Sequence, residues 1–116
     1  MLFTELNIGG ESYKLRLNTR ASIALEKSLG RSPLAVFMEI DNGEMPQLKD
    51  MVMILQACLQ PYHHSFTLDK TYDLFDAYVA DGHSIFDLIP VFIEVFQGSG
   101  YLAKPAEGTA EAEEKN

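Results

Sequence analysis

Hydrophobic and polar residues alternate strictly over residues 12–17, which read Ser-Tyr-Lys-Leu-Arg-Leu. A period of two is typical of a half-buried β-strand. Gly9-Gly10 precedes this segment, and two glycines suit a tight hairpin turn in which φ must be positive. The pattern therefore predicts a β-hairpin over residues 2–17. Two strands alone are marginally stable, so we expect the hairpin to pack on the rest of the chain or to pair with another chain.

From residue 18 onward the hydrophobic positions recur with the period of an α-helix. Each helical stretch begins at a residue that favours a helix N-terminus and ends at a glycine, a proline or a polar turn. These signals predict four amphipathic helices, over residues 18–29, 32–40, 46–59 and 67–80.

A fifth segment, residues 84–97, is hydrophobic at all but a few positions. A helix that is apolar on nearly all sides is expected to be buried on nearly all sides, but a chain this small rarely encloses one helix completely. Two interpretations stay open: this is the central core helix, or part of it is an exposed interface. Pro90 lies inside the segment and should kink the helix or mark a late start.

The chain has 116 residues, of which 47% are hydrophobic, and this is enough for one folded domain. The predicted fold class is α+β and mostly helical, with an N-terminal β-hairpin followed by about five α-helices. We expect a single domain over residues 1–102. Residues 103–116 have no hydrophobic pattern and predict a disordered acidic tail.

The net charge of -8 is distributed unevenly. Residues 1–37 carry five basic and three acidic groups, whereas residues 38–103 carry two basic and ten acidic groups. The excess of carboxylates argues against broad nucleic-acid binding. The charges either keep the protein dissolved or let the basic end of one copy meet the acidic end of another copy or of a partner. The candidate residues for such self-association are Lys14, Arg16 and Arg20.

The sequence predicts a cytoplasmic protein. No run of 18 apolar residues occurs, so we expect no membrane-spanning segment. The N-terminal residues lack the basic and apolar regions of a signal peptide. The single cysteine excludes an intramolecular disulfide.

Several residues are of types that carry chemistry: His63, His64, His83, Cys58, Asp69, Asp73 and Asp76. Adjacent histidines on an extended loop point in opposite directions, which is poor geometry for a metal site. The cysteine lies on the hydrophobic face of a predicted helix, as a structural thiol does. The three aspartates share one helix surface, as solvated carboxylates do. No glycine-rich phosphate-binding motif occurs. We therefore expect neither catalysis nor a metal nor a cofactor.

The order and lengths of these segments resemble the tail assembly chaperones of long-tailed bacteriophages, prophages and gene transfer agents. The resemblance covers about residues 3–102 and is carried by the segments "YKLRL", "ALEKSLGRSP", "MVMILQACL" and "TLDKTYDLFDAY". It implies a non-enzymatic protein that binds the tape measure protein, keeps it soluble, helps recruit tail tube subunits and is absent from the finished virion. Many such proteins also have a longer form made by ribosomal frameshifting near the end of the short reading frame.

A chaperone for an apolar helical client needs an exposed, adaptable hydrophobic surface together with net charge. The candidate surface is the exposed part of the last helix with two residues of the second helix: Phe86, Ile89, Phe92, Ile93, Phe96, Phe37 and Met38. Two alternative functions stay open, a small structural tail or head-tail connector component of the virion, and a bacterial protein-interaction or regulatory module.

Overall fold

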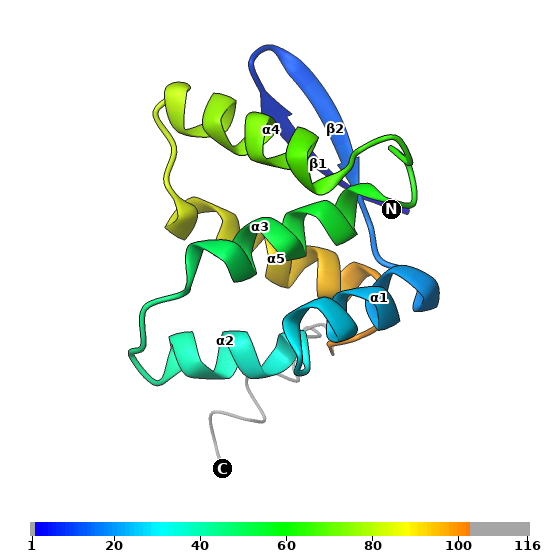
Figure 1. Ribbon diagram of the computed structural model, residues 1–116, viewed down its shortest axis with the longest axis vertical. Coiled ribbons are helices and arrows are strands. Elements are labelled where there is room, and N and C mark those ends of the chain that lie inside the picture. The colour runs from blue at the N-terminus through cyan, green and yellow to red at the C-terminus, as the bar shows by residue number, and fades with distance from the viewer. Residues whose placement is uncertain (1, 103–116) are drawn as a thin grey trace, which may run out of the picture.

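The chain forms an N-terminal β-hairpin followed by five α-helices, which confirms the predicted fold class (Figure 1). The computed structural model describes residues 2–102, and the predicted disordered tail over residues 103–116 lies outside them. The elements are β1 (Thr4–Ile8), β2 (Glu11–Leu15), α1 (Thr19–Leu29), α2 (Pro33–Asp41), α3 (Leu48–Leu59), α4 (Leu68–Ala80) and α5 (Ile85–Gly98).

The hairpin turn has the conformation that its two glycines predict. Ile8 and Glu11 are paired across the turn, and Gly9 and Gly10 between them have φ angles of 60° and 83°. Two successive positive φ angles are the requirement of the tight hairpin turn whose twist matches the strands. The Gly9 N–H donates a hydrogen bond to the Asp81 carboxylate at 2.6 Å, so the turn is attached to the end of α4. The hairpin therefore packs on the rest of its own chain.

The helix ends follow the predicted capping residues. The side chains of Asn18, Ser32 and Thr67 each accept a hydrogen bond from a backbone N–H in the first turn of α1, α2 and α4. Gly30 ends α1 in the left-handed conformation, with φ of 75°. The helix predicted from residue 46 begins two residues later, because Gln47 is still extended, with ψ of 138°.

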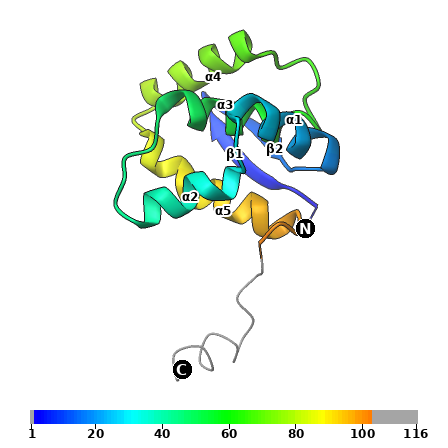
Figure 2. The ribbon, with the colours of Figure 1, turned by 60° about the horizontal axis from the view of Figure 1, so that its bottom comes forward.

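The central helix of the fold is α3, which contacts α1, α4, α5 and β2 (Figures 1 and 2). Eight of its twelve residues are buried. By contrast, α5 buries one face only, through Leu88, Phe92, Val95 and Phe96. The interpretation of the last helix as the central core helix is therefore wrong, although one side of it belongs to the core.

The last helix is continuous through Pro90, so this proline does not mark a late start. Proline has no N–H to donate, which leaves the carbonyl of Phe86 without its helical partner. Pro90 and Phe86 are both exposed, so this carbonyl lies on the solvent side of α5. Within residues 2–102, no helix has both the length and the apolar character that crossing a membrane requires.

Candidate functional site

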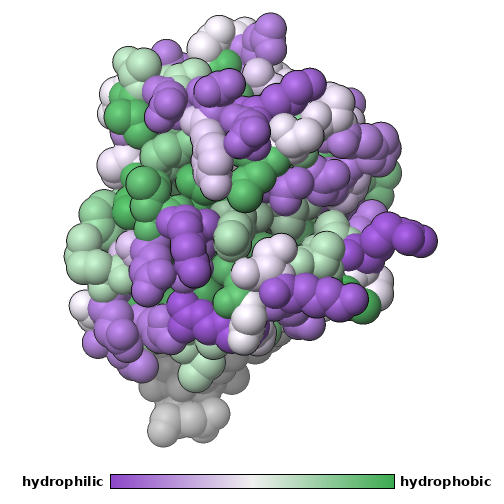
Figure 3. Space-filling model, in the orientation of Figure 1, coloured by the Kyte–Doolittle hydropathy of each residue, from purple (hydrophilic) through white to green (hydrophobic). Residues whose placement is uncertain are grey.

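Large hydrophobic side chains are exposed at the end of the molecule where α2 and α4 end and α3 and α5 begin (Figures 1 and 2). Five such side chains, between 47% and 71% exposed, lie in these helix ends and in the loop between α2 and α3: Met38, Met45, Leu48, Val79 and Phe86. We call these five residues the apolar end. Figure 3 shows hydrophobic atoms along the left side of the molecule, which is this end.

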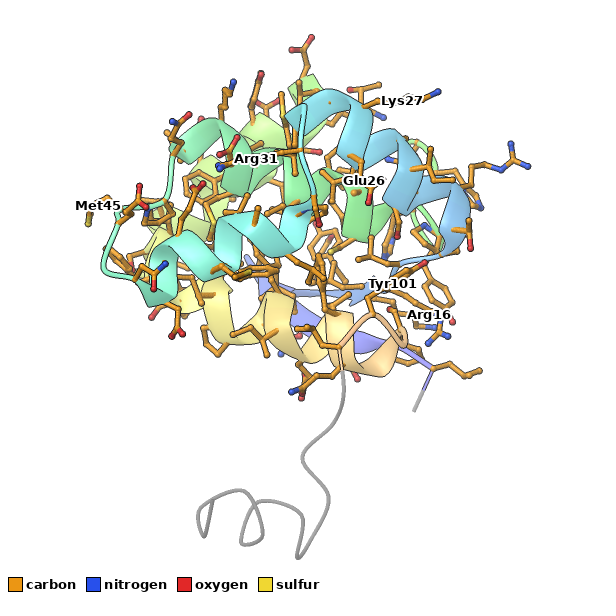
Figure 4. All side chains as sticks on the ribbon, turned by 90° about the horizontal axis from the view of Figure 1, so that it is seen from below. Arg16, Glu26, Lys27, Arg31, Met45 and Tyr101 are labelled. Atoms are coloured by element: carbon orange, nitrogen blue, oxygen red, sulfur yellow. The ribbon has the colours of Figure 1, made fainter. Side chains whose placement is uncertain are left out.

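Backbone hydrogen bonds hold the first part of the loop that carries Met45, up to Glu44. The N–H of Gly43 donates to the Ile40 carbonyl at 3.0 Å, and the N–H of Glu44 donates to the Glu39 carbonyl at 2.9 Å. The side chain of Met45 extends away from the protein at the tip of this loop (Figure 4). A flexible thioether side chain that points outward from such a loop is suited to contact a partner.

The seven residues of the predicted surface differ in exposure, from exposed through half-buried to buried. Phe86 and Met38 are exposed and belong to the apolar end. Ile89 and Ile93 are half-buried, and Ile89 packs against the core.

Phe92 and Phe96 are buried at 0% and 2% exposure, so their assignment to an exposed surface is wrong. Phe37 is half-buried because its ring packs edge-on against Phe96, with ring centres 5.0 Å apart. Phe92 and Phe96 lie on the buried side of α5, which packs on α3, and Phe96 joins α5 to α2 through its contact with Phe37.

Carboxylates accompany the exposed hydrophobic side chains at the apolar end. Asp41, Glu44, Asp81 and Asp87 lie in its loops and helix ends, and none of them is paired with a lysine or arginine within residues 2–102. The acidic and basic residues that are separated along the sequence are therefore also separated in the folded protein. Figure 4 shows Met45 at one end of the molecule and the basic residues Arg16 and Lys27 at the other.

The three basic residues proposed for self-association are partly engaged within the chain. The ammonium of Lys14 lies over the Phe3 ring, 4.9 Å from its centre. The Arg16 guanidinium donates to the Leu2 carbonyl at 2.7 Å. Arg20 is exposed on α1. Self-association through this basic end stays a prediction.

An ion-pair cluster that sequence reasoning missed fixes the helices behind the apolar end. Arg31, in the loop between α1 and α2, donates to the carboxylates of Glu39 on α2 and Asp50 on α3, the latter at 3.0 Å. The hydrogen bond to Glu39 is the largest cause of the raised pKa of Arg31, and the hydrogen bond to Asp50 is the next. Asp50 is buried in the first turn of α3. The cluster could have been found from the sequence, because Asp50 is a charged residue at a position where the helical period of α3 predicts a buried side chain.

Two of the residues whose types could carry chemistry, His63 and Cys58, have contacts that stabilise the fold. The Nε2 atom of His63 accepts a hydrogen bond from the Lys14 N–H at 3.0 Å, which joins β2 to the loop before α4. Burial, with the nearby charges of Lys14 and His64, lowers the pKa of His63. Cys58 is fully buried, and burial raises the pKa of its thiol. Within the part of the chain that the structure describes, no group of three or more potential metal ligands occurs.

Two hollows lie away from the apolar end, one of about 460 Å³ between β1 and the second half of α5, and one of about 280 Å³ between α1 and α3. Two charged residues of the first hollow are engaged within the chain. Arg16 donates to the carbonyls of Leu2 and Gly98, and Glu5 accepts from the Ser12 hydroxyl at 2.6 Å. The exposed apolar end is therefore the stronger candidate for recognition.

No curated protein and no solved structure matches this chain. A family model matches it over nearly its whole length, from residue 4 to residue 115. The chain belongs to DUF6096, a family of unknown function.

Proposed function

We propose that the protein is a non-enzymatic assembly chaperone of bacteriophage or prophage tails, acting in the cytoplasm of the bacterial host. It binds the tape measure protein, keeps that long helical chain soluble and helps recruit tail tube subunits. The observation that carries this proposal is the apolar end, where five of the ten large hydrophobic side chains exposed within residues 2–102 lie at one end of the molecule.

The physical requirements of the role support the proposal. A tape measure protein exposes apolar helical segments until the tail tube encloses them, so its chaperone has to offer hydrophobic surface before assembly. Two of the five exposed residues are methionines, Met38 and Met45, whose flexible side chains adapt to different partners. The net charge of -8 would keep the complex in solution.

The experiment that tests the proposal is co-expression with the tape measure protein encoded near this gene. We expect the wild type to keep the tape measure protein in the soluble fraction and to be retained with it in a pull-down. The double variant Met45→Ser, Phe86→Ser should lose both effects. A matched control, Ile23→Ser with Tyr72→Ser, removes two side chains of similar exposure outside the apolar end and should behave like the wild type.

Two results would contradict the proposal: an insoluble tape measure protein in the presence of the wild type, or equal retention by both double variants. Purified virions separate the chaperone from a structural tail component. We expect the protein to be absent from them, and its presence in stoichiometric amounts would favour the structural role.

A further inference from the structure

We propose that the apolar end binds an amphipathic helix whose hydrophobic face is flanked by lysine or arginine residues. The inference rests on the proposed function, because it names the chemistry of the client segment. Three features of the apolar end support it: the exposed hydrophobic side chains, the carboxylates around them and the backbone hydrogen bonds in its loops.

The hydrophobic side chains define the apolar half of the recognition. They come from the last turns of α2 and α4, the first turns of α3 and α5 and one loop, so they form a surface rather than a stripe on one helix. A helix with apolar residues at every third or fourth position presents a complementary face to such a surface.

The carboxylates define the charged half. The two segments that build this end, residues 38–50 and 79–89, contain six carboxylates and a single lysine, Lys49. Arg31 from outside these segments neutralises Glu39 and Asp50. Of the remaining carboxylates, Asp81 accepts from the Gly9 N–H, and Asp87 accepts from the Ser84 N–H and lies 3.6 Å from the His83 Nδ1 atom. With Asp41 and Glu44 they leave a negative surface beside the hydrophobic one. Lysine or arginine residues at the edges of the partner's apolar face would complement it.

The backbone of the loops favours a helix over an extended peptide. An extended segment that binds as an added β-strand does so through backbone hydrogen bonds, and it needs unpaired backbone groups on its receptor. Seven of the loop N–H groups at the apolar end, those of residues 42–44 and 81–84, already donate within the chain, which leaves few of them for an extended peptide. A helix satisfies its own backbone and needs only side-chain contacts.

Two designed peptides of about 18 residues test the inference. They share one leucine-rich face and differ only in its flanks, which carry lysine in one peptide and glutamate in the other. Affinities for the full-length protein are measured by isothermal titration calorimetry, and the helicity of each bound peptide by circular dichroism. We expect the lysine peptide to bind as a helix at least about tenfold more tightly than the glutamate peptide at low salt.

Variants locate the binding site. Met45→Ser with Phe86→Ser should weaken binding of the lysine peptide at least about tenfold, because the contacts of two exposed hydrophobic side chains are lost. Ile23→Ser with Tyr72→Ser should leave the affinity unchanged. Asp41→Asn with Glu44→Gln should weaken binding and flatten its salt dependence.

The matched control for the charge variant is Asp69→Asn with Asp73→Asn, which removes two exposed carboxylates near the other end of α4. This control should bind like the wild type. Thermal unfolding of each variant confirms that it is folded before its affinity is compared.

Three results would overturn the inference. The first two are equal affinity for both peptides and binding that survives loss of the Met45 and Phe86 side chains. The third is self-association of the wild type that blocks binding of the lysine peptide and that the Arg20→Gln variant lacks. The last result would make a second copy of the chain the occupant. Failure of the proposed function is distinguishable, because a tape measure protein that stays insoluble leaves the peptide result standing. Conversely, a solubilised tape measure protein with equal binding of both peptides refutes the inference alone.

Discussion

Replacement of Phe92 by alanine should destabilise the fold far more than the same replacement of Phe86, although both residues lie on α5. The Phe92 side chain is fully buried, and removing a buried aromatic ring costs about 3–5 kcal/mol through lost burial and the cavity left behind. The Phe86 side chain is half exposed, so at most about 1.5 kcal/mol of burial is lost. Alanine also has the higher helix propensity, by about 0.5 kcal/mol, so the net change at Phe86 should be below about 1 kcal/mol.

Urea unfolding followed by far-ultraviolet circular dichroism measures both changes, because the chain has no tryptophan for fluorescence. A domain of this size has a free energy of unfolding of about 5–15 kcal/mol, so the Phe92 variant should lose a large fraction of its stability at an unchanged slope. Ile23→Ala on α1 serves as the exposed control. Equal losses for Phe86 and Phe92, or a larger loss for Phe86, would refute the assignment of the buried and exposed sides of α5.

Three further predictions follow from the polar and thiol contacts. Folding lowers the pKa of His63, so the unfolded chain takes up its proton first, and stability should fall as the pH drops below about 6.5. His63→Gln keeps an acceptor for the Lys14 N–H and should lack this part of the pH dependence of urea unfolding. The Cys58 thiol should react with a disulfide reagent slower in the native protein than in denaturant, by a factor on the order of 10³ or more; comparable rates would contradict its burial. Arg31→Met should lower the midpoint of urea unfolding because it leaves the buried carboxylate of Asp50 without its arginine partner, and adding Asp50→Leu should restore part of that loss.

The elements that local signals encode were predictable from the sequence. The turn at Gly9-Gly10, the caps at Asn18 and Thr67 and the stop at Gly30 each depend on the φ angle or side-chain oxygen of one residue and its near neighbours. Such signals act within a few residues, so they are readable without knowledge of how the helices pack. The error at the start of α3 arose where no capping side chain is present.

The buried side of α5 was not predictable in the same way. A helix with hydrophobic residues on nearly every side has no polar face in its sequence to show which side is exposed. Its orientation is decided by where α3 and β1 lie, and this places Phe92 inside and Phe86 outside. For the same reason the apolar end was found only in part. Met45 and Leu48 are far from α5 in sequence, and packing of the helices brings them to the same end.

The carboxylates at the apolar end also bear on what the exposed hydrophobic surface does not bind. An exposed patch on a small domain favours association of two copies through that patch. Two copies facing each other there would bring Asp41 and Glu44 of one close to the same carboxylates of the other, and like charges at a contact oppose pairing. A client helix with basic flanks meets the same hydrophobic side chains with attraction in place of repulsion. The charges that would oppose pairing of this end with itself are therefore the charges that would select its partner.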